Sequence, residues 1–344
     1  MSEPRWLTPE TLPAYLVEQG HVSADEPIVV RPLAWGVSNL VLRVDRTGHP
    51  SFVVKQSRPQ LRTKIEWLSR CERIYREADV LRALVPQLPP ITVPRVLFED
   101  RPNYALGLEA IRADHVVWKE SLLQGVIDTS VADRLGQLLA MMHTSTFGQR
   151  DCLPDPDDWS LFDELRIDPF YRYVARVHPD LESVMTDLID EMAAHRCCLV
   201  HADFSPKNVL IHPDGVSLVD FETGHWGDPA FDIGFFLSHL FLKTLLPRFD
   251  QNRAVALITQ FWSQYRRTVH AAGSEFSAED VATRVPRHLA GCLLARVDGK
   301  SPVDYLADAT QRDFVRRHAL AWLYDPPPTW EQLVPEWFLD LMTV

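Results

Sequence analysis

The sequence predicts an α+β fold of two lobes: a small antiparallel sheet with a helix, then a larger and mainly helical part. Short apolar runs between turn residues fill the first 109 positions, helical periodicity dominates after position 130, and a hairpin pattern interrupts the helices at 209–219. The chain has 344 residues, of which 46% are hydrophobic, so it is long enough to build two cores.

The first lobe is expected to span residues 1–108. An opening helix is predicted over 9–19, because Thr8 is a suitable cap and Gly20 a suitable end. A charged, amphipathic stretch predicts a long helix over 61–84, which the prolines between 86 and 94 would close. The strands of the sheet are predicted at 28–31, 40–44, 51–55, 95–98 and 104–109.

Residues 109–112 would form a hinge, and the second lobe would occupy 113–344. The segment 231–246 is the most apolar of the chain but contains Asp232, His239 and Lys243, which predicts a buried helix rather than a membrane span. The other helices are predicted at 131–143, 181–195, 252–271, 277–295 and 303–323, with a short one after the proline-rich segment 324–330.

Composition bears on partners and location. Residues 1–107 contain 14 Lys and Arg against 12 Asp and Glu, whereas the remainder contains 21 against 35. This balance argues against a nucleic acid partner and favours a cationic substrate, although an acidic surface also serves solubility alone. Five cysteines and an N-terminus without a leader pattern predict a cytoplasmic protein with no membrane association. The sequence leaves the oligomeric state open.

The stretch from His201 to Asn208, His-Ala-Asp-Phe-Ser-Pro-Lys-Asn, is followed by Asp220-Phe-Glu222. In phosphoryl transfer one Asp accepts the proton of the attacking hydroxyl, while an Asn and a second Asp hold divalent metal on the nucleotide phosphates. We therefore expect Asp203 to be the base and Asn208 and Asp220 to bind Mg²⁺, because a hairpin over 209–219 would bring the two ligands together. The alternative is a hairpin whose aspartates only cap turns.

Lys55 ends an apolar strand, where an ammonium is costly unless it reaches a partner. A nucleotide phosphate would be such a partner, with the helical Glu77 holding the lysine in place. The loop residues Gly36 and Ser38 would cover the β-phosphate. The backbone of Glu109 and Ile111 would meet the adenine edge. The plainer interpretations are a surface Lys and Glu, an ordinary turn and a simple connector.

Three residues are expected to support the catalytic loop: His201 as a hydrogen-bonding anchor, Asp228 as the N-cap of the apolar helix with Pro229 after it, and Asp232 as an acceptor for the loop backbone. Side chains that suit a hydroxylated substrate stand around the loop in the sequence, although each also fits a salt bridge or a packing role. They are Arg166, Tyr171, Trp226, Arg296 and Asp298.

Together these motifs resemble the aminoglycoside phosphotransferase and choline kinase group, the small-molecule relatives of protein kinases. The resemblance covers most of the chain: Gly36 to Asn39, Val54-Lys55, Arg76-Glu77, residues 135–143, the catalytic loop, Asp220 and residues 227–232. It implies a bilobal protein-kinase-like fold that binds ATP or GTP with two magnesium ions. It also implies Asp203 as base, Asn208 and Asp220 as metal ligands, and Lys55 with Glu77 as the phosphate-anchoring pair.

The sequence differs from protein kinases at positions that bear on the class of substrate. Ala202 replaces the Arg of the His-Arg-Asp motif, Glu222 replaces the Gly after Asp-Phe, and no Ala-Pro-Glu follows. A protein substrate is therefore disfavoured. Residues 113–123 also resemble methylthioribose kinase, but that branch lacks the metal-binding Asn and has Asp-Pro-Glu, whereas this chain has Asn208 and Phe221.

The sequence thus predicts a metal-dependent kinase that transfers the γ-phosphoryl group of ATP to a hydroxyl of a small molecule. The acceptor would be like an aminoglycoside, a sugar or an amino alcohol. Two alternatives stay open: a nucleotide-binding pseudokinase without turnover, and a methylthioribose-kinase-like sugar kinase.

Overall fold

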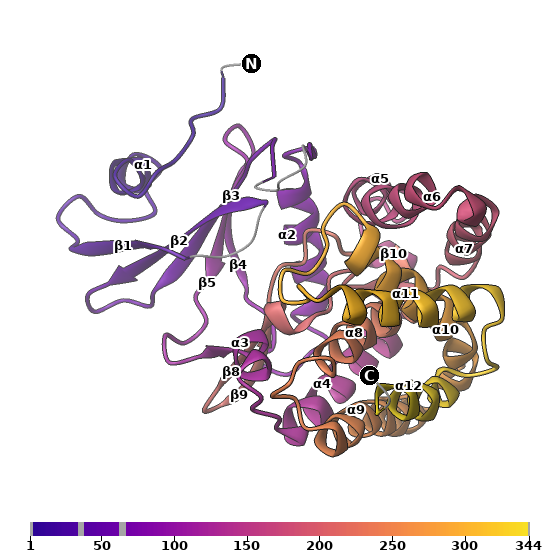
Figure 1. Ribbon diagram of the computed structural model, residues 1–344. Coiled ribbons are helices and arrows are strands. Elements are labelled where there is room, and N and C mark those ends of the chain that lie inside the picture. The colour runs from indigo at the N-terminus through magenta and orange to yellow at the C-terminus, as the bar shows by residue number, and fades with distance from the viewer. Residues whose placement is uncertain (1–2, 34–37, 62–66, 343–344) are drawn as a thin grey trace.

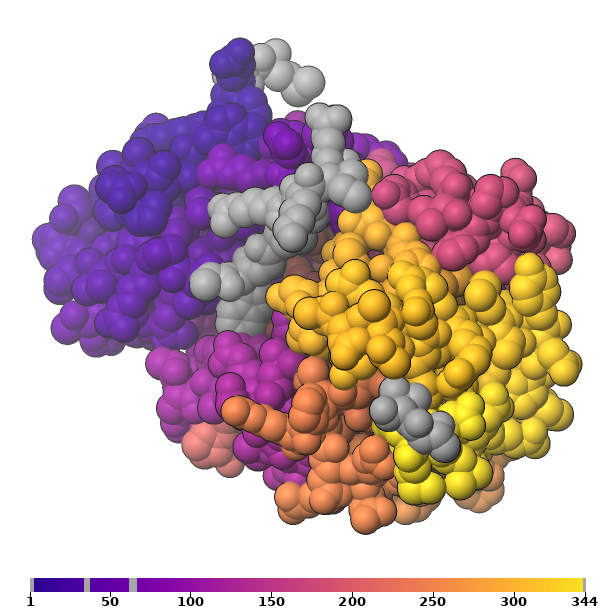
Figure 2. Space-filling model, viewed as in Figure 1, coloured from indigo at the N-terminus to yellow at the C-terminus, as the bar shows by residue number. Residues whose placement is uncertain are grey.

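The computed structural model describes residues 3–33, 38–61 and 67–342, and it has the two-lobed architecture that the sequence predicts. Figures 1 and 2 show the first lobe, coloured indigo to purple, standing against one side of the larger lobe. The first lobe contains an antiparallel sheet with the strand order β1-β2-β3-β5-β4. Its strands are β1 Ile28–Pro32, β2 Asn39–Arg46, β3 Phe52–Ser57, β4 Val96–Asp100 and β5 Ala105–Glu109.

Helix α2, Arg73–Leu84, packs on β3, β4 and β5 and presents its apolar residues to them. The predicted helix over 61–84 was therefore too long. Within 61–72 the described residues are not helical, and Leu68 pairs with Gln60 in an isolated bridge. Leu61 and Trp67 pack on Leu165 of the second lobe, so their apolar side chains serve a contact between lobes rather than a helix face.

The opening helix is also shorter than predicted, because α1 runs only from Leu12 to Glu18. The backbone N–H of Thr8 donates to the hydroxyl of Thr11 at 2.9 Å, and the N–H of Leu12 donates to the Thr8 carbonyl. Thr8 thus sits in a turn before the helix. Tyr15 and Leu16 of α1 are fully buried with Leu42 and Val44 of the sheet.

The second lobe is mainly helical, with two small β elements beside the first lobe (Figure 1). The predicted hairpin is present as β8 Val209–His212 and β9 Gly215–Leu218, with β6 Val116–Val117 alongside β8. A second pair joins β7 Cys198–Val200 to β10 His225–Gly227. The longer helices are α4 Thr129–Thr146, α7 Glu182–Ala194, α8 Pro229–Lys243, α9 Gln251–Ala272, α10 Ala278–Asp298, α11 Ala309–Tyr324 and α12 Leu333–Leu341.

Side-chain caps set where several of these helices begin. Asp128, Asp228, Asp250, Ser277 and Asp308 each accept a backbone N–H from the first turn of α4, α8, α9, α10 and α11. The cap at Asp308 explains why α11 starts six residues later than the sequence predicts. Asp228 is followed by Pro229 in the first turn of α8, as expected.

Helix α8 is buried along its whole length. It packs between α9 and α10 and carries Asp232 beneath the loop at 201–208. Among the described helices none is long and apolar enough to cross a membrane. A π-helical segment, Asp163–Arg172, was not predicted; it contains Pro169 and brings Arg166 to the same loop.

Helices α4 and α9 pack closely because Gly136 lets their backbones approach. A Cβ at this position would lie 2.2 Å from the carbonyl oxygen of Phe261. We expect Gly136→Ala to lower the free energy of unfolding by about 1–3 kcal/mol through overpacking, measured by urea unfolding. Gln137→Ala, one position along and half-buried, is the control and should change stability by about 0.5 kcal/mol or less. Equal stability of Gly136→Ala and the wild type would contradict the close approach.

Candidate active site

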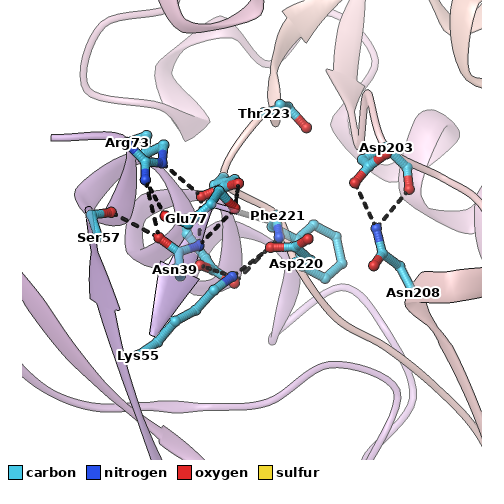
Figure 3. Close-up of polar contacts among 12 residues, drawn as sticks. Asn39, Lys55, Ser57, Arg73, Glu77, Asp203, Asn208, Asp220, Phe221 and Thr223 are labelled. Carbon is cyan, nitrogen blue, oxygen red and sulfur yellow. Dashed lines mark hydrogen bonds and ion pairs between the residues drawn. The ribbon is translucent and has the colours of Figure 1, made fainter. Parts of the chain in front are cut away.

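Lys55 in β3 joins the two lobes through its ammonium group (Figure 3). Its Nζ lies 2.7 Å from Oε2 of Glu77 in α2 and 2.5 Å from Oδ1 of Asp220, which follows β9. The other oxygen of Glu77 accepts the backbone N–H of Phe221 at 3.3 Å. Lys55, helix α2 and the end of the hairpin are thus held in one network. Lys55 and Glu77, which the sequence predicts as a pair, are in direct contact.

The charges of this network are set by burial and by one another. Burial alone would lower the pKa of Lys55, but Asp220, Glu77 and Glu222 raise it above its ordinary value. Burial would raise the pKa of Asp220, yet Lys55 and Lys207 hold it well below the usual range. Asp220 is therefore an ionised carboxylate, which is the form that binds a hard cation.

Glu222 forms a second link between the lobes, and no role was predicted for it. Its carboxylate accepts from the hydroxyl of Ser38 at 2.5 Å, from the side-chain amide of Asn39 at 2.8 Å and from Nε of Arg73 at 3.1 Å. Arg73 is fully buried and also donates to the Ser38 carbonyl. The only signal in the sequence was a Glu where protein kinases have Gly.

The loop after β7 places Asp203 beside positive side chains and Asn208. Its carboxylate lies 2.7 Å from the guanidinium of Arg166 and 2.7 Å from Nζ of Lys207. It also accepts the Asn208 amide N–H at 2.8 Å, as Figure 3 shows. Burial would raise the pKa of Asp203, but Arg166 and Lys207 lower it below its usual value. Asp203 is therefore ionised and able to accept a proton.

Asp232 holds the loop backbone from below. Its two oxygens accept the backbone N–H groups of His201 at 2.8 Å and of Ala202 at 2.7 Å, and His143 contacts the same carboxylate. Ala202 has a φ of +58°, which L residues rarely adopt, so these bonds hold a strained turn directly before Asp203. His201 stacks on Phe221, and burial lowers the pKa of its imidazole, which favours an anchoring rather than an acid–base role.

Asn208 and Asp220 fit the requirements of a divalent metal site. The Asn208 Oδ1 is buried and has no hydrogen-bond partner among the described residues, while its amide nitrogen is used by Asp203. Oxygen ligands of this kind suit Mg²⁺, which keeps much of its coordination for phosphates and water. Asp220 has a φ of +73°, another strained position at the site.

A pocket between the lobes runs from Lys55, Glu77 and Asp220 to the chain segment that connects the lobes. It contains about 710 Å³ of space, part of it open to solvent. Glu109 and Ile111 line it, as does Ser38, whose hydroxyl is held by Glu222; the Ile111 carbonyl accepts from Arg43. Gly36 lies outside the described residues. The apolar walls are Leu33, Val41, Val53, Leu108, Leu210 and Val219.

The structure places some of the candidate substrate residues near Asp203 and others in the core. Arg166 contacts the carboxylate of Asp203, and Arg296 lies within electrostatic reach of both. Tyr171 is fully buried with its hydroxyl 3.6 Å from Sγ of Cys292, and Trp226 is buried in β10. Neither side chain has a buried polar atom left without a hydrogen-bond partner among the described residues, so direct substrate contacts by these two residues are not supported.

Asp298, the remaining candidate, is held by ion pairs at the end of α10. Its carboxylate lies 2.7 Å from the Arg316 guanidinium and 2.8 Å from Nε2 of His178. Those partners account for its position without a substrate.

Residues 29–268 match the model of the phosphotransferase enzyme family. The chain belongs to this family. This phosphotransferase is therefore a kinase of the small-molecule type, and the resemblance seen in its sequence is confirmed. A methylthioribose kinase from Cronobacter sakazakii is 27% identical over 271 residues, which are 71% of this chain and 67% of that protein.

Solved structures share the fold of this phosphotransferase. An amicoumacin kinase in complex with AMP-PNP, Ca²⁺ and Ami has a TM-score of 0.55 and 16% identity, over 88% of this chain and 91% of the other. A choline kinase from Cryptosporidium parvum has a TM-score of 0.55 and 12% identity, over 94% and 97% of the two chains. At such identities the likeness shows the α+β fold.

Replacing Asp232 by Asn tests the support of the catalytic loop. An amide has one acceptor oxygen, so one of the two backbone N–H groups would face an amino group. We expect the free energy of unfolding to fall by about 2–3 kcal/mol, measured by chemical denaturation, and turnover to fall with it. Asp187→Asn, on an exposed face of α7, is the control and should be nearly neutral. Unchanged stability of Asp232→Asn would show that the loop does not depend on this carboxylate.

Proposed function

We propose that this phosphotransferase transfers the γ-phosphoryl group of ATP to a hydroxyl group of a small molecule, with Mg²⁺ and with Asp203 as the base. The observation that carries the proposal is the juxtaposition of Asp203, Asn208 and Asp220, where Asp220 also lines a pocket together with the Lys55–Glu77 pair. This is the set that phosphoryl transfer requires.

In this mechanism the ammonium of Lys55 binds the α- and β-phosphates, and Glu77 keeps it in place. Adenine would occupy the apolar part of the pocket near Glu109 and Ile111. Asn208 and Asp220 would hold Mg²⁺, which supplies positive charge that neutralises the phosphate oxygens. GTP is a nucleotide to be tested beside ATP.

Asp203 accepts the proton of the acceptor hydroxyl as that oxygen attacks the γ-phosphorus, and the bond from the γ-phosphorus to the β–γ bridging oxygen breaks to release ADP. Lys207 lies 2.7 Å from Asp203 and 3.9 Å from Asp220, and its side chain is 41% exposed. Its charge therefore stands between the base and the metal ligands, where it stabilises the negative charge of the group in transfer. Arg166 fixes the other oxygen of Asp203.

The acceptor class is the finer part of the proposal. A sugar is the first class to test, because relatives such as the Cronobacter protein are named methylthioribose kinases. Aminoglycosides and amino alcohols follow from the sequence. The acidic balance of the second lobe favoured a cationic acceptor, but the side chains that surround Asp203 include the cations Arg166 and Lys207.

The reducing cytoplasm is the proposed location, since it supplies ATP. All five cysteines are free thiols in the structure, which suits that compartment.

Asp203→Asn tests the base. We expect kcat to fall about a thousandfold, because an amide accepts no proton from the hydroxyl. ADP binding, measured by calorimetry with Mg²⁺, should stay within about threefold, which shows that the variant is folded. Asp214→Asn in the exposed turn of the same hairpin is the control and should keep its activity. Turnover retained in Asp203→Asn would overturn the assignment, and binding of ATP without turnover of any acceptor in the wild type would favour the pseudokinase.

A further inference from the structure

Beside Asp203 the second lobe buries a group of basic and hydroxyl side chains that the mechanism above does not use. Lys243 and His239 lie on α8, Arg296 on α10, and Tyr305 on the segment between α10 and α11. We call these four residues the basic cluster. Lys243 is only 1% exposed; its Nζ donates to the His239 carbonyl at 3.0 Å and lies 5.3 Å from the centre of the Tyr305 ring.

Side-chain contacts connect the basic cluster to Asp203 through Arg166 and two phenylalanines. The Arg166 guanidinium, which pairs with Asp203, lies over Phe235 at 5.4 Å and over Phe170 at 5.7 Å. The Phe235 ring is 4.9 Å from the ring of His239. The Phe170 ring is 5.9 Å from the guanidinium of Arg296. The basic cluster therefore adjoins the place where an acceptor hydroxyl must stand.

Basic side chains in the basic cluster outnumber the acidic groups that oppose them. Burial lowers the pKa of Lys243 to about 7, and Lys119 and Arg296 act in the same direction, while Asp304 opposes them. The pKa of His239 lies well below its ordinary value, chiefly because the imidazole is buried. The neighbouring positive groups act in the same direction; they are Arg296, Lys243, Lys207 and Lys119.

Lys243 donates its hydrogen bond to the carbonyl oxygen of His239, and Arg296 donates to the carbonyl oxygen of Ser301. Asp203 lies within electrostatic reach of Arg296, but its carboxylate is already held by Arg166 and Lys207. Burying cations in this way is unfavourable unless an anion completes the set.

Three polar atoms of the basic cluster are also without a hydrogen-bond partner. Nε2 of His239, Nε of Arg296 and the hydroxyl of Tyr305 are all buried, and each lacks a partner among the residues that the structure describes. Buried polar groups in native proteins are nearly always satisfied. All three can donate a proton, as Lys243 can, so the ligand that would satisfy them is an acceptor of several hydrogen bonds.

We propose that the acceptor of this phosphotransferase carries an anionic oxygen group, a carboxylate or a phosphate, and that Lys243, His239, Arg296 and Tyr305 bind it. The inference rests on the proposed function, since it concerns the acceptor side of the same site. With its anionic end in the basic cluster, a hydroxylated molecule a few carbons long would present a hydroxyl to Asp203.

The test compares matched compounds that differ in the anionic group. Binding to the full-length protein saturated with ADP and Mg²⁺ is measured by calorimetry for ribose, ribonate and ribose 5-phosphate, and for glycerol, glycerate and glycerol 3-phosphate. ADP occupies the nucleotide site, so that anions do not bind there. We expect at least one anionic compound to bind about tenfold or more tightly than its uncharged match, and the better of the two anion types identifies the group.

Lys243→Met then removes one charge with a side chain that suits burial. We expect the affinity for the preferred anion to fall about tenfold, with ADP affinity within about twofold of the wild type and partial recovery in Lys243→Arg. Lys300→Met is the control; its ammonium lies over the Trp67 ring and the variant should bind the anion normally.

The proposal is overturned if the uncharged compounds bind as tightly as the anions, if no anion binds at about 10 mM, or if Lys243→Met leaves anion affinity unchanged. These outcomes are distinct from a failure of the proposed function. That failure would appear as absent Mg²⁺–ADP binding or as absent phosphoryl transfer to any acceptor, whether or not the anions bind.

Discussion

The architecture of the site depends on one constraint: the ammonium of Lys55 is buried and must be paired. Its partners come from two distant parts of the chain, Glu77 in α2 and Asp220 after β9. Removing either would leave a charge in a poorly solvated place, which is far more costly than losing a surface ion pair. The pairing therefore fixes the position of the first lobe relative to the metal ligands, and with it the shape of the nucleotide pocket.

The catalytic loop is held by a different device. Asp232 lies inside an apolar helix and uses both oxygens on the backbone of His201 and Ala202. The left-handed conformations of Ala202 and Asp220 are the local cost of turning Asp203 and the metal-binding carboxylate toward each other. A fully buried helix beneath the loop provides the rigidity that such strain requires. Lobe position and loop geometry are thus set by separate networks that meet at Asp220.

Features encoded by local pattern were predictable from the sequence. The alternating strands, the hairpin with its Pro-Asp-Gly turn and the cap at Asp228 all follow from neighbouring residues. Features made by long-range contacts were not. Glu222 hydrogen-bonds to Ser38 and Arg73, and Arg166 contacts Asp203 from a π-helical segment. No local sequence pattern predicts these contacts. The burial of Tyr171 and Trp226 was likewise not predictable, because an aromatic residue near a motif in sequence says little about burial. The basic cluster combines α8, α10 and the following segment, so only the folded chain reveals it.

We expect the arrangement of Lys55, Asn208 and Asp220 to bind a metal–nucleotide complex for transfer. Calorimetric titration of ATP into the wild type and into Asp220→Asn, each with Mg²⁺ and with excess EDTA, tests it most directly. The account predicts that Mg²⁺ strengthens ATP binding by the wild type about tenfold or more and has little effect on the variant. An equal gain from Mg²⁺ in both proteins would contradict it.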